Sequence, residues 1–251
     1  VESGEIWVKT PSMLKEYYKR PGATAESISP HGYFMTGDAG FFAEDAHLKI
    51  IDRGRDVGKL NDGTLFAPQF LENKLKFFPY IKEAVCFGHQ HDKVCAFINI
   101  DPDAIGNWAE KRSMAYSGYT DLAARDEVYD LVRECVEQVN ADLAGEPEIA
   151  ASQIHRFLIL HKELDADDGE LTRTRKVPRN YIGEKYQDLV SALYDGRTSV
   201  HVNAQVRYED GRTGTYSADL KVRDARTFAP AAAKQAACSF RSRTSPWRLV
   251  E

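Results

Sequence analysis

The sequence has no long apolar run and no strongly basic face. No hydrophobic stretch approaches the roughly 18 residues that a membrane-spanning helix needs, and no signal peptide opens the chain. The formal net charge of -5 argues against a dedicated nucleic-acid-binding protein. We therefore expect a cytoplasmic protein that binds no nucleic acid, while a peripheral membrane contact and the oligomeric state stay open.

The sequence also lacks paired cysteines. Its four cysteines are scattered, without a C-x-x-C pair or the spacing of metal ligands, which is typical of reduced, buried thiols in a cytosolic protein. His89 and His91 stand next to Asp92 and could suggest a metal site, but they lie between two apolar runs, where a polar turn is the better interpretation. We expect no metal site within this chain. The cysteines are Cys86, Cys95, Cys135 and Cys238.

The remaining composition is that of an ordinary globular protein. Hydrophobic residues make up 43% of the 251 residues and charged residues 28%. This length suffices for one large domain or two small ones. The chain starts at Val1, without a methionine and directly in a strand-like segment, which suggests a fragment of a longer protein.

The first quarter of the chain has the pattern of a β-rich unit. Residues 4–9 predict a short strand, which precedes a polar stretch marked by Pro and Gly that runs to Pro30. Residues 40–52 then predict a hairpin with a polar turn at 43–47. The dense charged segment 53–56 follows and is the first good candidate for a domain boundary.

The next block alternates helices and strands. Apolar positions at helical spacing predict a helix from Pro68, and two apolar runs around a polar turn predict a hairpin. A repeat every three or four residues predicts one long helix over 121–143. Together these elements predict an α+β domain over residues 54–196, with a small mixed sheet flanked by helices. The hairpin strands are expected at 83–88 and 94–100, a third strand at 157–160 and a closing helix at 179–193.

The C-terminal part has a different pattern. Apolar and polar residues alternate on both sides of Asp210-Gly211, between residues 200 and 223, which predicts a β-hairpin. We expect residues 197–227 to form this hairpin as an extension. Residues 228–251 are rich in Ala, dotted with Arg and without periodicity, and we expect a disordered tail there.

Three polar segments could carry chemistry, and the first is Gly32-Tyr33-Phe34-Met35-Thr36-Gly37-Asp38. Gly37 frees the backbone for a tight turn, which would present the Asp38 carboxylate beside backbone amides. A carboxylate so placed suits a vicinal diol, because two hydroxyl donors can share its two oxygens. Taken alone, an ordinary turn that contains an aspartate is the simpler interpretation.

The other two segments are basic. In the run 51–56, Arg53 could donate to a ribose or phosphate oxygen, although a solvated charge run is the better interpretation of this segment taken alone. In the run 171–179, Lys176 follows an acidic loop and could neutralise phosphate charge, although a basic helix entrance is the plainer explanation. None of the three segments is specific by itself.

The order of the three segments is specific. The sequence T-G-D, then about fifteen residues, D-R-x-x-D, then over a hundred residues, L-T-x-T-x-K resembles the adenylate-forming superfamily of acyl-CoA synthetases, luciferases and peptide-synthetase adenylation domains. The resemblance runs from Gly4 to about Tyr194. The stretches GEIWVKTPSMLKEYYKRPGAT and GKLNDGTLFAPQFLENKL resemble the long-chain fatty acyl-CoA synthetases in particular.

The resemblance implies roles for the residues on the nucleotide side. Asp38 matches the carboxylate that binds both ribose hydroxyls of ATP and of the acyl-adenylate. Thr36 and Tyr33 would line the same pocket, and Arg53 matches an arginine on the ribose side. Arg55 takes the place of the hinge about which the family's small C-terminal lid rotates.

The resemblance also implies roles on the lid. Lys176 matches the lysine that contacts the fatty carboxylate and the α-phosphate, and Arg175 is a rival for this role by one position. The loop with Gly58, Lys59 and Gly63 would lie near the pantetheine tunnel.

The implied architecture is a mobile lid over residues 54–196 behind the β-rich C-terminal edge of a large AMP-binding domain at residues 1–53. The implied activity is that of a long-chain fatty acid–CoA ligase, which makes acyl-AMP from a fatty acid and ATP and then transfers the acyl group to coenzyme A. ATP and Mg²⁺ would be held mainly by residues upstream of Val1, so we expect the fragment alone to be inactive. The alternatives are an acyl-AMP ligase that delivers to an acyl-carrier protein, and a non-catalytic module that binds a partner.

Overall fold

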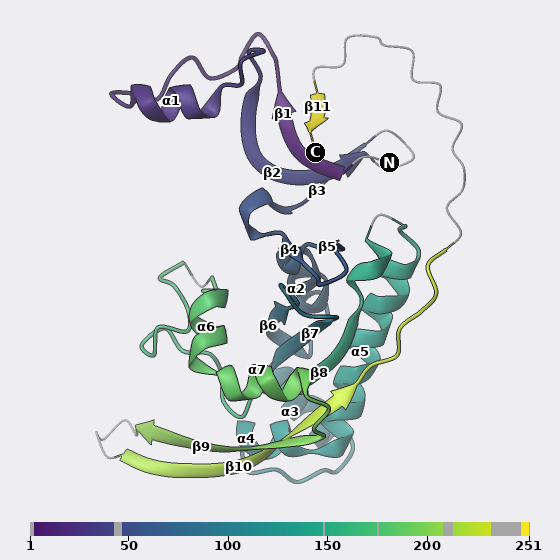
Figure 1. The fold of residues 1–251 in the computed structure, drawn as a ribbon. Coiled ribbons are helices and arrows are strands. Elements are labelled where there is room, and N and C mark those ends of the chain that lie inside the picture. Colours follow the sequence, from purple (N-terminus) through teal and green to yellow (C-terminus); the bar gives the residue numbers. More distant parts are fainter. Residues whose placement is uncertain are drawn as a thin grey trace.

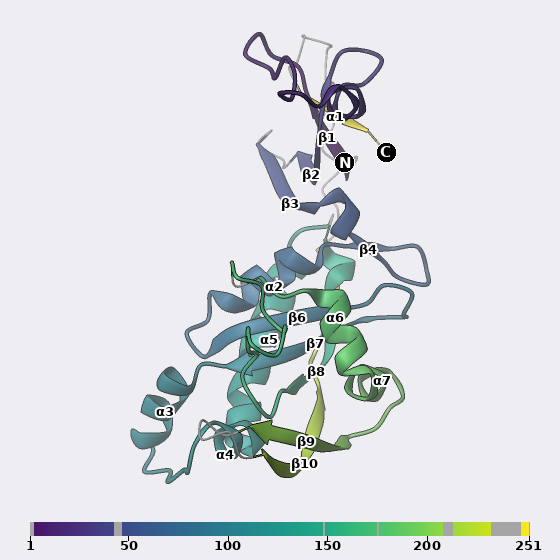
Figure 2. The ribbon, with the colours of Figure 1, turned by 90° about the vertical axis from the view of Figure 1, so that its left-hand side faces the viewer.

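The computed structural model describes residues 3–42, 47–147, 149–174, 176–207, 213–231 and 247–250. The chain forms a four-stranded sheet at one end and a five-stranded sheet with its helices at the other, as Figures 1 and 2 show from two sides. A two-stranded ribbon lies between them. The expected α+β fold with a small mixed sheet is therefore confirmed.

The four-stranded sheet is antiparallel and has the order β11-β1-β2-β3. Its strands are β1 (Ser3–Val8), β2 (Phe34–Phe42), β3 (Leu48–Arg53) and β11 (Trp247–Val250). The hairpin predicted over 40–52 is thus present, but β2 begins earlier. The expected disorder of residues 228–251 does not hold for β11, because this strand pairs with β1 over four residues.

In this region one element was not predicted and one local prediction is wrong. The short helix α1 (Pro21–Ser27) lies in the polar stretch before Pro30, and none of its residues is buried, so no apolar stripe could have revealed it. The expected tight turn at Gly37 is instead an irregular point inside β2, where Gly37 has a φ of 73° and the register with β1 shifts. Such bulges re-aim side chains without ending a strand.

The five-stranded sheet is mixed, with the order β6-β7-β8-β10-β9. The hairpin of β6 (Ile81–Phe87) and β7 (Val94–Ile100) is antiparallel, as predicted, and β8 (Ile154–Ile159) runs parallel to β7. All seven residues of β7 are buried, which explains why its sequence is a continuous apolar run rather than an alternating one.

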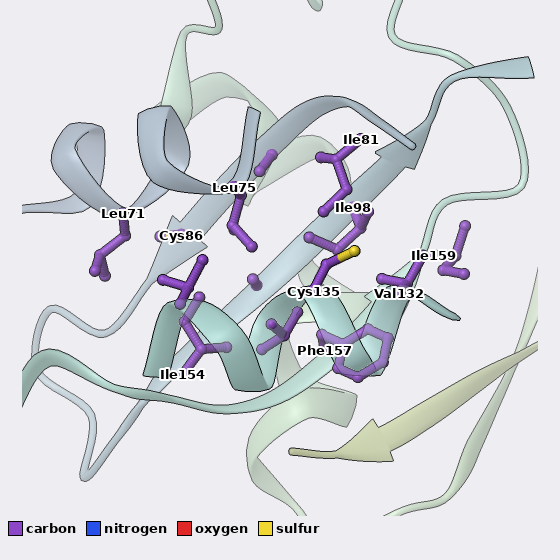
Figure 3. Packing of buried hydrophobic residues seen from close by; sticks show 14 of the residues in the cluster. Leu71, Leu75, Ile81, Cys86, Ile98, Val132, Cys135, Ile154, Phe157 and Ile159 are labelled. Carbon is purple, nitrogen blue, oxygen red and sulfur yellow. The ribbon is translucent and has the colours of Figure 1, made fainter. Parts of the chain in front are cut away.

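Helices cover both faces of this sheet. On one face, α2 (Pro68–Lys76) and α5 (Asp126–Ala144) pack through their apolar stripes onto the strands, as Figure 3 shows for part of the core. On the other face, α6 (Arg179–Lys185) and α7 (Gln187–Tyr194) form a second apolar cluster with the sheet. Phe41 of β2 belongs to the first cluster, so the four-stranded sheet also packs against this core.

Two predicted helices are each broken in two. The helix predicted over 121–143 is α4 (Tyr119–Ala124) followed by α5, because Arg125 between them is extended and its guanidinium bonds Asp121 at 2.9 Å. The helix predicted over 179–193 breaks at Tyr186 into α6 and α7. A further helix, α3 (Pro102–Glu110), was not predicted, although the Asp101 side chain caps it by accepting from the Ala104 N–H at 2.8 Å.

The C-terminal hairpin is part of the sheet. Strand β9 (Ser199–Arg207) pairs with β10 (Thr213–Asp224), and β10 pairs in turn with β8. The predicted turn at Asp210-Gly211 lies outside the described residues. Leu220 of β10 is only 4% exposed and belongs to the second apolar cluster, so the hairpin completes the core over α7.

The shortest elements connect these parts. They are the 3-10 turns η1 (Gly54–Asp56) and η2 (Ala150–Ser152), and the ribbon strands β4 (Gly58–Lys59) and β5 (Leu65–Phe66). Among the helices that the structure describes, none is long and apolar enough to cross a bilayer.

Candidate functional site

An ion pair links the first two sequence motifs. Asp38 and Arg53 are direct partners on the adjacent strands β2 and β3, and Arg53 Nη1 lies 2.9 Å from Asp38 Oδ1. About a quarter of the Asp38 side chain is exposed, so one face of the carboxylate remains open to solvent. The register of the hairpin therefore places a carboxylate and a guanidinium side by side, although fifteen residues separate them.

Hydrogen bonds at the irregular point in β2 fix the backbone that carries the Asp38 carboxylate. The Thr36 hydroxyl accepts from the Asp38 N–H at 3.1 Å and donates to the Ile6 carbonyl at 2.9 Å. The Gly37 N–H donates to Glu5 Oε1 at 3.1 Å. The Thr36 hydroxyl is thus engaged in hydrogen bonds to the backbone of Asp38 and Ile6.

Tyr33 lies apart from this pair. It precedes β2, its N–H donates to the Ser29 hydroxyl at 3.1 Å, and the Lys9 ammonium lies 5.3 Å from the centre of its ring. The described contacts of Tyr33 do not include Asp38 or Arg53. Its predicted place in the nucleotide pocket stays a prediction.

The predicted hinge is a single 3-10 turn, η1, between the two sheets. The Arg55 side chain is 86% exposed, and its Nε lies 3.8 Å from Asp56 Oδ1, too far for a hydrogen bond. Just before the turn, Asp52 is buried and accepts from the Gln69 N–H at 2.9 Å, in the first turn of α2. Burial raises the pKa of Asp52 above its ordinary value, although the N–H groups of Gln69 and Arg53 and the charge of Arg179 oppose the rise.

The third motif forms a closed loop after β8, the lysine loop, which comprises the described residues 171–174 and 176–178. The Thr172 N–H donates to the Lys176 carbonyl at 2.8 Å, and the Lys176 N–H donates to the Thr172 hydroxyl at 2.9 Å. The Lys176 side chain is exposed, and no carboxylate in the described part of the chain pairs with it. Arg175 lies outside the described residues, so its rivalry with Lys176 stays open.

One cleft of about 910 Å³ brings these motifs together. It lies between the four-stranded sheet and the start of α6, and the residues that line it come from all three motifs. Arg53, Arg55 and Lys176 all line this cleft, and such cations can bind an anion. Asp38, the ion-pair partner of Arg53, is not among the residues that line the cleft. Its lining includes Gly37, Arg53, Arg55, Lys176, Arg179 and Asn180.

The loop predicted to lie near the pantetheine tunnel is the ribbon β4–β5. A Cβ on Gly58 would come within 2.2 Å of the Phe66 ring, so this position requires glycine. Gly63 has a φ of 91° in the turn, and the Lys59 N–H donates to His89 Nδ1 at 3.2 Å. The ribbon borders a second cleft, of about 610 Å³, which also touches α6 and α7.

His89 and His91 each make a contact within the folded domain. His89 accepts from the ribbon, and the ring of His91 stacks on Tyr194 with 3.7 Å between the ring centroids. Within the described residues, no group of three His, Cys, Asp or Glu side chains is placed to hold a metal ion. Cys86, Cys95 and Cys135 are buried free thiols, and Cys238 lies outside the described residues.

Two ion-paired carboxylates near the lysine loop escaped the sequence reasoning. Glu72 is 7% exposed and receives Arg179, whose Nη2 lies 2.7 Å from Oε1 and 2.9 Å from Oε2. Burial raises the pKa of Glu72, and Arg179 opposes the rise. The only signal in the sequence was a lone acidic residue within an apolar helix stripe.

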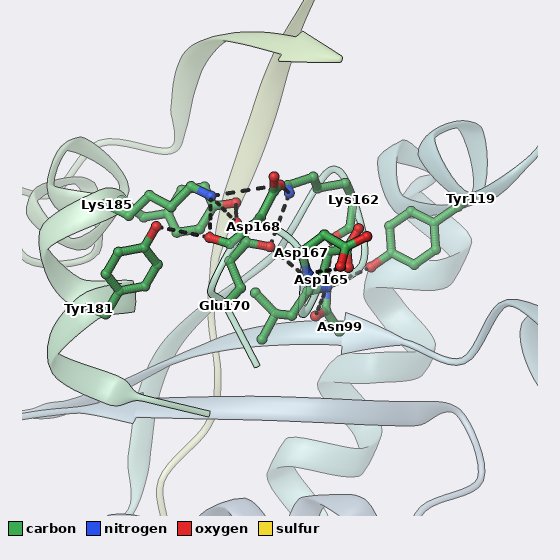
Figure 4. Close-up of polar contacts among 11 residues, drawn as sticks. Asn99, Tyr119, Lys162, Asp165, Asp167, Asp168, Glu170, Tyr181 and Lys185 are labelled. Atoms are coloured by element: carbon green, nitrogen blue, oxygen red, sulfur yellow. Dashed lines mark hydrogen bonds and ion pairs between the residues drawn. The ribbon is translucent and has the colours of Figure 1, made fainter. Parts of the chain in front are cut away.

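Glu170 is the second carboxylate, and Figure 4 shows its contacts. It is fully buried and accepts from Lys162 at 3.0 Å, from Lys185 at 2.8 Å and from the Tyr186 hydroxyl at 2.6 Å. Burial alone would raise the pKa of Glu170, but these donors outweigh burial and lower it. Tyr186 is also the residue at which the predicted helix breaks into α6 and α7.

A third polar cluster lies on the hairpin. His201 contacts the Ser217 hydroxyl through Nε2 at 2.9 Å and Asp219 through Nδ1 at 2.8 Å. The His201 and Asp219 side chains are more than half exposed, and none of the three residues lines the two large clefts. We interpret this cluster as cross-strand pairing on an open sheet face.

Comparison with known proteins relates this geometry to a family. Residues 56–198 match the family described as the AMP-binding enzyme C-terminal domain. The chain is 32% identical over 195 residues to the long-chain-fatty-acid–CoA ligase FadD15 of Mycobacterium tuberculosis, covering 77% of this chain and 32% of that protein. It is 30% identical over 196 residues to the human long-chain-fatty-acid–CoA ligase 1, covering 76% and 27%. The chain therefore spans about a third or less of these relatives.

Two solved structures resemble this chain in fold. The adenylation domain of a carboxylate reductase from Mycobacterium chelonae superposes with a TM-score of 0.53 at 26% identity, over 76% of this chain and 27% of that one. The corresponding domain from Segniliparus rugosus, in complex with AMP and a co-purified carboxylic acid, gives 0.54 at 22% identity over 76% and 28%, which supports the fold alone. Because the family match covers more than half of the sequence and includes the ribbon, the five-stranded sheet's first three strands and the lysine loop, the chain belongs to the AMP-binding enzyme C-terminal domain family.

Proposed function

We propose that this chain is the C-terminal portion of an ATP-dependent long-chain fatty acid–CoA ligase. The observation that carries the proposal is the cleft in which Arg53, the exposed turn at Arg55 and the unpaired Lys176 meet. In this proposal residues 1–53 are the edge of the large AMP-binding domain, and the lid begins at the turn. The long-chain type rests on the similarity to the two fatty-acid ligases.

In the first half-reaction, a carboxylate oxygen of the fatty acid attacks the α-phosphorus of ATP, and the bond to pyrophosphate breaks. Asp38 would accept hydrogen bonds from the two ribose hydroxyls, with Arg53 holding the carboxylate in place. Lys176 would lie beside the α-phosphate, where negative charge accumulates. A cation so placed is worth several kcal/mol in a site that excludes water.

In the second half-reaction, the thiolate of coenzyme A attacks the acyl carbonyl of acyl-AMP, and AMP leaves. The lid would turn about Arg55, which withdraws Lys176 and brings the β4–β5 ribbon to the acceptor channel. An exposed one-turn connector suits such a rotation, because few contacts need to break. One mobile domain would thereby serve two chemical steps and exclude water from a hydrolysable acyl phosphate.

The described residues offer no cluster for Mg²⁺. We therefore assign no step to a metal within this chain. In this proposal, Mg²⁺ that accompanies ATP would be held mainly by residues upstream of Val1.

The test is Lys176→Ala in the full-length protein that carries this chain. We expect fatty-acid-dependent exchange of pyrophosphate into ATP to fall by about a hundredfold or more. Transfer from supplied acyl-AMP to coenzyme A should change much less. Lys111→Ala is the matched control, because Lys111 is an exposed lysine at the end of α3, away from both clefts.

The same assays separate the alternatives. A wild-type protein that forms acyl-AMP but acylates only a phosphopantetheinyl carrier protein would make it an acyl-AMP ligase of that kind. A wild-type protein without pyrophosphate exchange for any fatty acid would favour a partner-binding module. Unchanged exchange in Lys176→Ala would contradict the role of this lysine.

A further inference from the structure

We propose that Thr172 is a positioning residue for Lys176, and that buried carboxylates at both ends of the lysine loop hold the loop rigid. The lysine loop comprises residues 171–174 and 176–178, the described residues between Glu170 and Arg179. The inference rests on the proposed function, because it assumes that Lys176 acts on the nucleotide. It adds a reason why a threonine stands four residues before this lysine in the motif L-T-x-T-x-K.

The loop is closed by paired hydrogen bonds between Thr172 and Lys176. One runs from the Thr172 N–H to the Lys176 carbonyl, and the other from the Lys176 N–H to the Thr172 hydroxyl. Both end on the same two residues, so together they fix the peptide groups on either side of the Lys176 Cα. Thr174 does not share this role: among the described residues, its hydroxyl contacts the Thr172 hydroxyl at 3.1 Å and no backbone group of Lys176.

The N-terminal end of the loop is held by Glu170. This carboxylate is fully buried and binds two lysines, one tyrosine and the Asp165 N–H. A carboxylate with four donors cannot shift without leaving a buried group unpaired. The next residue, Leu171, packs against the second apolar cluster, so the loop leaves the domain at a fixed point.

The C-terminal end of the loop is held by Arg179. Its guanidinium makes three hydrogen bonds to Glu72, between 2.7 and 3.2 Å, and Glu72 also accepts from the Cys86 N–H at 2.9 Å. Glu72 lies on α2, which follows the β4–β5 ribbon, while Arg179 begins α6. Val177 packs against the second apolar cluster, as Leu171 does. The exposed lysine therefore stands on a loop that is fixed at both ends.

This arrangement explains how an exposed lysine can act precisely. A lysine side chain has many rotamers, and ordering it opposes binding. When the backbone of the loop is already fixed, only the side chain remains to be ordered in the transition state, and preorganised groups stabilise developing charge best. The Thr172 hydroxyl supplies the last backbone contact, at the lysine itself.

The test compares three variants of the full-length protein. Thr172→Val removes the hydroxyl and keeps the shape, Thr172→Ser restores the hydroxyl, and Thr174→Val is the matched control. We expect Thr172→Val to lower kcat for acyl-AMP formation roughly three- to tenfold, the effect of one lost hydrogen bond. Thr172→Ser and Thr174→Val should stay within about twofold of the wild type.

Further measurements separate positioning from folding. Thr172→Val should leave the KM for ATP, the urea midpoint and the transfer from supplied acyl-AMP to coenzyme A unchanged, because its contact is confined to the loop. An equal loss in Thr174→Val, or no rescue by serine, would overturn the inference. If Lys176→Ala itself has no effect, the proposed function fails; if Lys176→Ala abolishes exchange while Thr172→Val is neutral, only the positioning role fails.

Discussion

The ion pair between Glu72 and Arg179 yields the sharpest stability prediction. In Arg179→Met the guanidinium is lost while the length of the side chain is kept, so Glu72 retains only the Cys86 N–H as a partner. Breaking a buried pair on one side costs about 3–5 kcal/mol. The Arg179 side chain is one-quarter exposed, so we expect the lower end, about 3 kcal/mol, or about 6–12 °C in Tm.

The dependence on pH has a definite sign. Burial already raises the pKa of Glu72 above its ordinary value of 4.5, and losing Arg179 raises it further. The folded variant then holds a proton that the unfolded chain releases, so its stability falls as the pH rises from 4.5 through the folded pKa. The deficit of Arg179→Met should therefore be largest at pH 7 and shrink as the pH approaches 4.5.

Urea unfolding of the 251-residue chain at several pH values measures both effects. The double variant Glu72→Met/Arg179→Met provides the control, because removing both charges leaves no buried charge unpaired. It should be more stable than Arg179→Met alone. A single variant within about 0.5 kcal/mol of the wild type, or a deficit that does not change with pH, would refute the reasoning.

Three further predictions test other parts of the molecule. Glu170→Gln should lower the free energy of unfolding by about 2 kcal/mol at pH 7, because two lysines lose a charged acceptor. Since the pKa of Glu170 is lowered in the folded chain, this stabilisation is lost as the pH falls below 4.5. The urea midpoints of variant and wild type should therefore converge in acid. Gly58→Ala should cost about 1–3 kcal/mol by its clash with Phe66, and Phe66→Leu in the same chain should recover part of that loss in thermal melts. Leu220→Ala should cost about 2–5 kcal/mol, whereas a negligible change would mean that the hairpin folds independently of the lid core.

Local patterns predicted most of the fold. The apolar stripe of α2 and the apolar runs of β6 and β7 gave elements within two residues of those observed, because each pattern reflects burial on one side or on both. The failures lie where a side-chain contact interrupts a repeat or where nothing is buried. Tyr186 interrupts an apolar repeat where its hydroxyl bonds Glu170, a contact that the repeat does not show. Arg125 interrupts another through a local bond to Asp121, and α1 buries nothing that a repeat could reveal.

The candidate site, like the fold, was predicted only in part from the sequence. The order and spacing of three motifs led to the superfamily and to Asp38, Arg53, Arg55 and Lys176, because the chemistry of binding a ribose and a phosphate restricts the residue types. The spacing could not predict that Asp38 and Arg53 are partners across one hairpin, nor that Gly37 lies within a strand. Both depend on the register of β2, which the sequence specifies only through its neighbours.

The sequence by itself determined which side chains can carry chemistry, since residue type and order are written in it directly. Only the tertiary structure decided which contacts fix these side chains in position. Glu72 and Arg179 are 107 residues apart, and no local pattern announces that a lone glutamate in a helix stripe will meet a given arginine. Such pairs form because a buried charge must find a partner wherever the fold brings one, and that meeting point is a property of the packed domain rather than of any segment.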